Sequence, residues 1–458
     1  MKVIKIYKLS KFNYFVEDNN NLLIYNAFKG SDSFLKLVGN VKEQFLYAWK
    51  WGATIDEQQF DSVTVNTFLQ KGVIVPLCED EQAKLSYLYL RTVHTGYLKL
   101  IILPNEKCNF RCQYCYENLP KQEMKSTTIE SILEFVHKKI RFFQGLNVTW
   151  YGGEPLLSLN TIIDMSSRFI ELCKKNNKVY LADITTNGFL LDTSTFQTLR
   201  KLHVFSYQIT IDGDEKTHNI QRPLHNGKGT YHTIMNNLKD IHTKAQGRFQ
   251  IIIRTNYSQI LANHLNLFID DLRQILQGDD RFQLLLRPVM DWGGQSIESF
   301  RENLVDVGIL DKVYEILSQT DLPLSLSYYK SLLNPGGAMC YAGQMDTYTI
   351  NSSGLIFKCT CDINNQQDSS IGEIVNRRFE IDRYKEMKWI SDIRSRHKDC
   401  TDCFFSPVCL YDFCPGRRNF SKGYSLSCPF EKYALSGLLK LMDKKEPFPT
   451  VEEEKLCR

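Results

Sequence analysis

From about residue 97 onward, short apolar runs alternate with longer segments whose apolar residues recur at helical spacing. The apolar runs predict strands at 96–103, 148–151, 179–186, 205–211, 249–255 and 282–286. The helical patterns predict helices at 126–143, 160–174, 194–201, 231–242 and 263–276. Strands that alternate with helices form a parallel sheet with the helices packed outside. The pattern therefore predicts an α/β fold, either an open doubly wound sheet or an incomplete barrel.

Composition narrows the class of protein. The chain has 458 residues, which is too long for one ordinary domain, and its net charge of +4 gives no argument for binding nucleic acid or a membrane. We find no signal peptide and no apolar run of the roughly 18 residues needed to span a bilayer. We therefore expect a cytoplasmic protein. Its 14 cysteines then favour metal or redox chemistry over disulfides.

Three cysteines, Cys108, Cys112 and Cys115, follow the first strand of the alternating region with the spacing C-x3-C-x2-C. Three thiolates are one fewer than a [4Fe–4S] cube needs, so one iron is left open to a small molecule. Zinc ligands and redox thiols are the alternatives, but zinc sites favour paired C-x2-C clips and four protein ligands. The spacing favours a cube with one open iron.

This string, with Tyr114 just before the third cysteine, resembles the signature of radical S-adenosylmethionine (SAM) enzymes. The resemblance implies a partial (β/α)6 barrel, with active groups at the C-terminal ends of the strands. It also implies that the open iron holds the methionine amine and carboxylate of SAM. One electron then splits SAM to a 5′-deoxyadenosyl radical, which abstracts hydrogen from a substrate.

Polar residues after the later strands resemble the SAM contacts of the same family. A Gly-Gly-Glu-Pro turn after the second strand resembles the motif that holds the SAM amino group, and glycines let backbone approach a ligand closely. For Arg222, Arg254 and Asn256 a surface or structural ion pair is the alternative. The contacts that the resemblance implies are Tyr114 (near the adenine), Gly152, Gly153, Glu154, Pro155, Thr186, Asn187, Thr210, Asp212, Arg222 and Asn256.

Eight further cysteines lie between residues 340 and 428, and they resemble the SPASM extension of radical SAM enzymes. That extension has seven cysteines and two auxiliary [4Fe–4S] clusters. One spacing departs from the family, because four residues separate the cysteines at 409 and 414 where three are usual. From spacing alone a pair of zinc ribbons is the alternative. The resemblance implies an outer cluster on Cys400, Cys403, Cys409 and Cys428 and an inner cluster on Cys340, Cys359 and Cys414.

Cys361 has two possible roles in this scheme. It is the natural fourth ligand of the inner cluster, two residues after Cys359. Alternatively it is free, and the inner cluster keeps an open iron for a substrate thiolate. Asp362, directly after Cys361, resembles the aspartate that acts as a base in sulfatase maturases. The alternative is that Asp362 caps a turn with Asn364 and Asn365.

The first ninety residues have their own pattern. Two strand-like runs around an Asn-rich turn in residues 12–25 predict a hairpin, and residues 72–76 predict a strand. Short helices are predicted at 34–38, 41–51 and 63–70. The order resembles the winged-helix domain that binds leader peptides in enzymes modifying ribosomal peptides, where the leader is added as a strand. A structural cap and a nucleic-acid-binding winged helix are the alternatives.

These patterns predict a winged-helix-like leader-binding domain (1–92), a radical SAM barrel (93–320) and a SPASM domain (321–458). We expect a peptide maturase with SAM and three [4Fe–4S] clusters. Its partners are a ribosomal precursor peptide, bound through its leader, and a reduced flavodoxin or ferredoxin-type donor. The expected product is a thioether from a cysteine. Carbon–carbon cross-linking, sulfatase-maturase-like formylglycine formation and a non-catalytic electron carrier are the rivals, and the last has no need of a SAM-binding motif.

Overall fold

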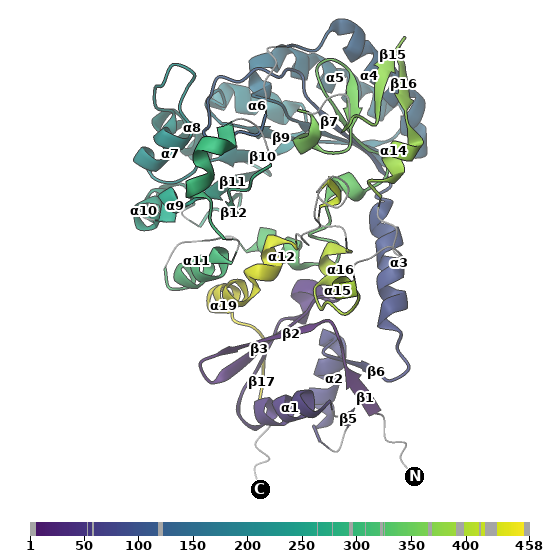
Figure 1. Cartoon of the computed structure of the whole chain (residues 1–458), viewed down its shortest axis with the longest axis vertical. Coiled ribbons are helices and arrows are strands. Elements are labelled where there is room, and N and C mark those ends of the chain that lie inside the picture. Colours follow the sequence, from purple (N-terminus) through teal and green to yellow (C-terminus); the bar gives the residue numbers. More distant parts are fainter. Residues whose placement is uncertain are drawn as a thin grey trace.

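The computed structural model is elongated and has three tiers: a barrel, a middle layer of helices and an N-terminal domain (Figure 1). Within these tiers no helix is long and apolar enough to cross a membrane. The structure describes residues 6–52, 54–56, 59–117, 122–262, 264–276, 278–292, 296–306, 308–320, 324, 326–364, 369–390, 398–411, 414–416 and 428–452.

The barrel tier contains a run of six parallel strands in the order β12-β11-β10-β9-β8-β7. The strands are β7 (Tyr97–Ile102), β8 (Gly145–Trp150), β9 (Val179–Thr186), β10 (Val204–Thr210), β11 (Gln250–Tyr257) and β12 (Phe282–Pro288). The connecting helices are α4 (Ser126–Lys139), α5 (Leu159–Lys175), α6 (Thr193–Lys201), α7 (Glu215–Gln221), α8 (Tyr231–Lys244), α9 (Gln259–Ala262) and α10 (Leu265–Leu276). The predicted partial barrel is therefore confirmed.

Local sequence explains why these helices pack outside the sheet. In α5 the buried residues Ile162, Met165, Phe169 and Cys173 recur at spacings of three and four, so they form one stripe against the strands. The cap of α6 is Asp192, whose carboxylate accepts a hydrogen bond from the main-chain N–H of Thr195 at 2.7 Å. The core that these stripes build runs through the whole barrel tier.

Four further strands continue the barrel sheet past β7. They are β13 (Thr347–Ile350), β14 (Leu355–Phe357), β15 (Gly372–Val375) and β16 (Arg378–Ile381). Strand β13 pairs parallel to β7, and the next three pair antiparallel in sequence. The short 3-10 turn η6 (Thr360–Asp362) follows β14 and carries two of the cysteines of the second set at or beside its start. This sheet extension brings that set next to the strand that precedes the first cysteine loop.

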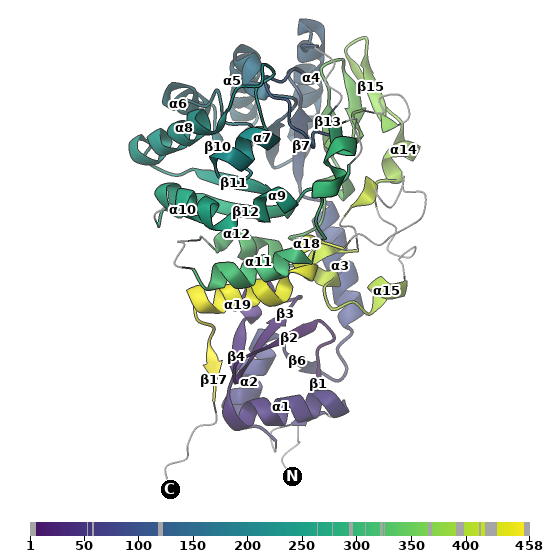
Figure 2. The same cartoon turned by 60° about the vertical axis from the view of Figure 1, so that its left-hand side comes forward.

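The middle tier is helical. Its elements are α11 (Ile309–Ser318), α12 (Ser327–Leu333), α15 (Lys398–Thr401), α16 (Ser406–Cys409), α18 (Phe430–Tyr433) and α19 (Leu435–Lys445), with α14 (Arg383–Met387) beside the sheet extension. Helices α11 and α19 lie side by side (Figures 1 and 2). The main-chain N–H of Gly437 donates to the carboxylate of Asp311 at 2.6 Å. An ion pair of 2.6 Å between Arg287 and the buried Glu431 joins this tier to the last barrel strand.

The N-terminal domain has two small sheets, ordered β5-β1-β6 and β17-β4-β3-β2. Its strands are β1 (Ile6–Leu9), β2 (Asn13–Asp18), β3 (Asn21–Asn26), β4 (Leu35–Leu37), β5 (Ile55–Asp56) and β6 (Ile74–Pro76). Its helices are α1 (Gly39–Trp51), α2 (Ser62–Lys71) and the long connector α3 (Glu81–Val93). The fourth strand of the second sheet, β17 (Thr450–Val451), comes from the other end of the chain.

The predicted hairpin, the two longer helices and the strand near residue 75 are present, but the predicted helix at 34–38 is wrong. Residues Leu35–Leu37 form β4, in which both leucines are buried and Lys36 between them is less so. This alternation has the period of a strand, and pairing with β3 and β17 stabilises it. Three residues are too few for the sequence to distinguish the two periods.

Candidate active site

The first cysteine loop lies at the C-terminal ends of the barrel strands. Cys108, Cys112 and Cys115 all line a cavity of about 660 Å³, together with residues from all six barrel strands. The Cys361 thiol of the second set lines the same cavity. Because the carboxyl ends of parallel strands meet at one end of a barrel, loops that are distant in sequence converge there.

The Gly-Gly-Glu-Pro turn holds the cysteine loop in place by close backbone contact. A Cβ on Gly152 would lie 2.4 Å from the carbonyl oxygen of Asn105, and one on Gly153 would lie 2.3 Å from that of Lys107. The main-chain N–H of Glu154 also donates to the Lys107 carbonyl at 2.8 Å. The glycines therefore admit the chain's own cysteine loop, which the sequence argument about ligand approach did not anticipate.

The Glu154 carboxylate is fully buried and bonded by the end of β9. One oxygen accepts from the Thr186 hydroxyl at 2.7 Å and from the main-chain N–H of Leu156 at 3.0 Å. The other accepts from the main-chain N–H of Asn187 at 2.8 Å. Burial raises the pKa of Glu154, while these hydrogen bonds oppose the shift. Pro155 begins the 3-10 turn η3 (Pro155–Ser158) that Glu154 caps.

A second network joins Tyr114 to the ends of β10 and β11. The Tyr114 hydroxyl donates to the Asp212 carboxylate and accepts from Arg222 at 2.7 Å and from the Asn256 side chain at 3.0 Å. Arg222 lies 3.8 Å from Asp212, and both are buried. The two residues form a buried ion pair, which is the alternative weighed for Arg222. Thr210, on the same strand end, lines the cavity.

The three thiols line one cavity, where each can supply one ligand to a metal cluster. Burial raises the pKa of both Cys108 and Cys115 to about 12, so a bound metal must displace their protons. Among the described residues, no three His, Cys, Asp or Glu side chains could hold one metal ion. A cube spreads its thiolates around several irons, one thiolate to each. The donor set at the cavity therefore fits a [4Fe–4S] cluster.

The second cysteine set falls into two groups. Cys409, in α16, is within electrostatic reach of Cys400, Cys403 and Cys428. In the other group, the Cys361 thiol donates to Cys359, which lowers the pKa of Cys359 and raises that of Cys361. The Tyr341 ring lies by Cys340, Cys359 and Cys361, and Cys414 lies by Cys361. No disulfide joins any two cysteines in the described part of the chain.

Asp362 directly follows a residue of the cavity wall. Its neighbour Cys361 lines the cavity, whereas Asp362 does not. One carboxylate oxygen is buried without a hydrogen-bond partner, and burial raises the pKa of Asp362 to about 6. Asn364 donates to the carbonyl of Tyr116, and Asn365 lies outside the described residues.

Polar residues inside the barrel were missed from the sequence. Lys99 of β7 and Asp183 of β9 line the cavity, and the Thr149 hydroxyl donates to Asp183 at 3.0 Å. The Lys99 charge opposes the rise that burial causes in the pKa of Asp183. Arg254, which the sequence did suggest, lines the same wall and donates to Asn256 at 3.0 Å. The available signal was a lysine between two leucines of β7 and an aspartate between Ala182 and Ile184 of β9.

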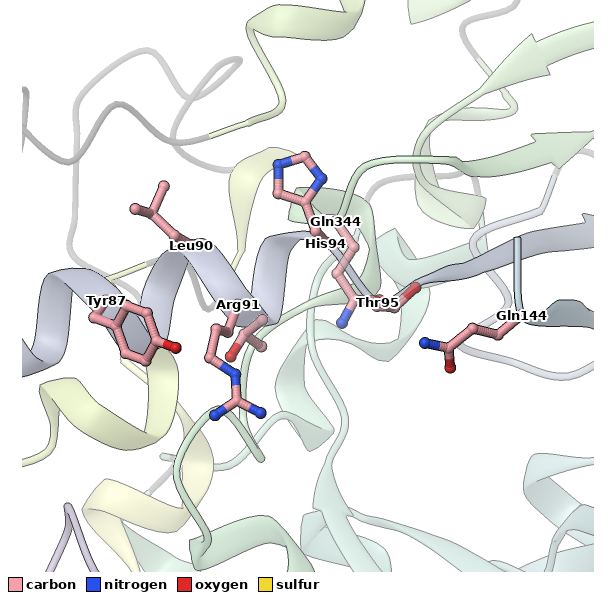
Figure 3. Close-up of a pocket in the computed structure, with 8 residues that line it drawn as sticks. Tyr87, Leu90, Arg91, His94, Thr95, Gln144 and Gln344 are labelled. Atoms are coloured by element: carbon pink, nitrogen blue, oxygen red, sulfur yellow. The ribbon is translucent and has the colours of Figure 1, made fainter. Parts of the chain in front are cut away.

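A second hollow of about 660 Å³ lies at the opposite ends of the strands, where α3 leads into β7 (Figure 3). Tyr87, Leu90, Arg91 and His94 line it from α3 and the turn after it, and Gln144 lines it from the start of β8. It contains none of the cysteines, so it is separate from the candidate active site.

Comparison with known proteins agrees with this geometry. Residues 102–253 match the model of the radical SAM superfamily. A cysteine-type anaerobic sulfatase-maturating enzyme of Clostridium novyi is 25% identical over 68% of this chain and 86% of its own length. The radical SAM cyclopropyl synthase TigE of Paramaledivibacter caminithermalis is 22% identical over 58% of this chain, and the match spans only 60% of TigE.

Among solved structures, native anSMEcpe with bound AdoMet and Kp18Cys peptide superposes with a TM-score of 0.56. It is 18% identical, and the match covers 77% of this chain and 97% of that chain. The fold, the cysteine loop and the family match together define a radical SAM domain. Residues 102–253 are therefore a radical SAM domain, and the members of that superfamily are enzymes that bind SAM and a [4Fe–4S] cluster.

Proposed function

We propose that this chain is a cytoplasmic radical SAM peptide maturase that forms an intramolecular thioether. It binds a ribosomal precursor peptide through its leader and joins a cysteine thiol of the core to a carbon that has lost a hydrogen atom. Three [4Fe–4S] clusters serve the reaction, one at the first cysteine loop and two in the second set. A reduced flavodoxin or ferredoxin-type protein supplies the electron that starts each turnover.

One observation carries the proposal: the first cysteine loop and Cys361 line the same cavity. When bound, SAM and the reduced cluster supply a radical that takes a hydrogen atom from the substrate. Thioether formation from a C–H and a thiol removes two hydrogens in all. One leaves as a hydrogen atom, and the other leaves as a proton and an electron. A second cluster at the cavity wall is an acceptor for that electron.

The barrel wall orients the substrate in this scheme. Lys99, Asp183 and Arg254 present both signs of charge to the cavity, and such groups hold the polar main chain and side chains of a peptide. The buried Tyr114 network and Glu154 fix the ends of the strands around SAM. Tyr151 and Tyr116, whose hydroxyls are 2.5 Å apart, line the wall between the first loop and Cys361.

The test is anaerobic incubation of the reduced protein with SAM and a small cysteine-bearing precursor encoded beside it. We expect 5′-deoxyadenosine, a peptide that has lost two hydrogens, and a cysteine that iodoacetamide no longer alkylates. A carbon–carbon cross-link also loses two hydrogens but leaves the thiol open to alkylation. Release of deoxyadenosine without any change in the peptide contradicts the proposal.

Formylglycine formation is the second candidate, because a sulfatase-maturating enzyme is among the relatives. That product replaces the cysteine sulfur by oxygen, so its mass separates it from a thioether. About a quarter of this chain lies outside the match to the anSMEcpe structure, of which the chain covers 97%. The additional length favours an enzyme with a further binding function.

Deleting residues 1–79 is expected to weaken precursor binding by at least about tenfold, or about 1.4 kcal/mol. The reason is that the deleted sheets offer strand edges to the leader. The deletion keeps α3, whose Leu85, Tyr89 and Val93 belong to the core shared with the barrel, and removes the part of that core that the N-terminal domain contributes. Binding is measured by fluorescence anisotropy with labelled precursor.

The control for this deletion is slow SAM cleavage without peptide, which the truncated protein should retain because strands β7 to β12 and their pairing lie outside the deleted residues. If the truncated protein binds and modifies the precursor as well as the full chain, the domain is only structural. Loss of cleavage as well would show that the barrel depends on the N-terminal domain.

Asp362→Asn is expected to keep all iron and deoxyadenosine formation but to lose cross-linked product by about 10² to 10⁴-fold, the range for loss of a general base. The buried, unpartnered carboxylate oxygen beside Cys361 motivates this expectation. Product is measured by mass spectrometry. The control Ser369→Ala removes only the hydroxyl that donates to the main-chain oxygen of Asp362. Normal yield from Asp362→Asn discards Asp362 and favours an inner-cluster iron that binds the substrate thiolate, with Cys361 not a ligand.

A further inference from the structure

The outer edge of the N-terminal sheet is occupied by a segment from the far end of the chain. Strand β17 leaves α19 and runs down beside β4 (Figure 2). Thr450 pairs with Lys36 and Val451 with Leu37 in parallel register. The main-chain N–H groups of Lys36 and Val38 donate to the carbonyls of Pro449 and Val451 at 2.9 and 3.3 Å.

An aromatic anchor holds this segment more than its strand does. Phe448 is 5% exposed, and its ring stacks on Phe34 with centroids 4.5 Å apart and planes 13° from parallel. Val451 packs against the core of the N-terminal domain. Asp443, in α19, accepts from the main-chain N–H of Phe448 at 2.8 Å and pairs with Lys36 at 2.7 Å.

The segment around β17 is paired and anchored as a bound peptide would be, and its pairing is short enough for another peptide to replace it. The strand has two residues, and the Thr450 side chain is exposed. Pro447 and Pro449 on either side of Phe448 favour extended backbone and lack N–H groups, so they limit how far the ladder can grow. Main-chain pairing beside a side-chain pocket is how sheets recognise extended peptides.

The other edge of the same sheet is differently placed. Strand β2 lies beside the middle tier, where the Tyr14 ring stacks on Phe404 at 5.0 Å. The β4 edge is therefore different: a separate segment of chain, anchored by one aromatic ring, covers the β4 edge.

We propose that the β4 edge is a peptide-binding groove which residues 447–452 fill from within, and that an external extended peptide with an aromatic anchor replaces them. That the external peptide is the leader of a precursor rests on the proposed function. The internal segment competes at high effective concentration, so it keeps peptides without such an anchor out of the groove.

The test uses a labelled peptide with the sequence of residues 444–452 and the full chain carrying Phe448→Ala. We expect wild type to bind the probe poorly, because its own segment fills the groove. The variant should bind it roughly a hundredfold more tightly, the scale expected for deleting a buried aromatic side chain. Thr450→Ala is the matched control, because it alters the exposed side chain of the same strand and should behave as wild type.

Hydrogen exchange reports the groove directly. The amides of Lys36 and Val38 should lose protection in Phe448→Ala and regain it when the probe is added, because they donate to this segment. A probe with alanine in place of Phe448 should not restore the protection of these two amides. Equal probe affinity in wild type and Phe448→Ala, or amides that stay unprotected at saturating probe, overturns the proposal and makes β17 a fixed structural strand.

Two measurements test whether the variant is folded. Protected β3 amides and retained SAM cleavage would show that Phe448→Ala is folded. If that variant does not fold, Val451→Ala, a smaller truncation on the same segment, replaces it and is also expected to bind the probe more tightly than wild type. No precursor is used, so a failure to modify precursor peptides leaves this test unaffected. The affinity of Phe448→Ala for the probe is likewise informative whether or not the chain is a peptide maturase.

Discussion

Replacing Cys108, Cys112 and Cys115 together by alanine is expected to abolish SAM cleavage completely. The three thiols line one cavity, and with all of them removed the first cluster has no protein ligand. Anaerobically reconstituted protein should fall from about twelve iron atoms per chain to about eight, from the stoichiometry of three cubes. Iron is measured colorimetrically, and deoxyadenosine by chromatography.

The control is Cys78→Ala, which removes an exposed thiol outside both cysteine sets and should change neither iron nor cleavage. Unimpaired cleavage in the triple variant would refute the assignment of the first loop. Loss of more than about half of the iron would instead show that the other clusters do not assemble independently, against the cubane stoichiometry used here.

Gly153→Ala, which adds a single methyl group, is expected to abolish SAM cleavage nearly as completely as the triple cysteine replacement does. The new Cβ would lie 2.3 Å from the carbonyl oxygen of Lys107 and 2.7 Å from its carbon, one residue before Cys108. Backbone cannot yield as a flexible side chain can, so the cysteine loop must move. Overpacking of a well-packed site costs about 1–3 kcal/mol, and a clash with backbone lies at or above the upper end.

The measurements are the thermal midpoint, the iron content and SAM cleavage. Gly416→Ala is the matched control, because the nearest described atoms to a Cβ there are the Trp389 ring at 3.6 Å and the Asp362 carboxylate at 3.9 Å, which are ordinary contacts. We expect Gly153→Ala to lose about a third of the iron, as the cubane stoichiometry implies, and all cleavage. Normal cleavage in Gly153→Ala would mean that the loop tolerates displacement and that the glycine is not needed for packing.

The barrel was predictable because its signals are local. Each strand is a short apolar run and each helix has a buried stripe, so period and length identify them without knowledge of partners. The helix α3 was equally readable, with Asp80 as its cap and Leu85, Tyr89 and Val93 at spacings of four, but the sequence analysis did not identify it. Strand β4 was different, because its partners come from elsewhere in the chain.

The candidate site was predictable as a set of residues but not as a set of contacts. The motifs identified Tyr114, Asp212, Arg222 and Asn256 separately as SAM contacts. Their hydrogen bonds to one another span about a hundred residues or more of sequence, and no spacing rule reports such pairs. Likewise the contact between Gly153 and the carbonyl of Lys107 depends on how two loops meet in space.

The pairing of β13 with β7 has a consequence for the order in which the protein is made. All pairs among β7 to β12 lie between residues 97 and 288, so this part of the sheet can form on the ribosome before the second cysteine set has been synthesised. Strand β13 then adds to an edge that already exists. Biogenesis can thus run in two stages, with the first cysteine loop shaped before the thiols of the second set emerge.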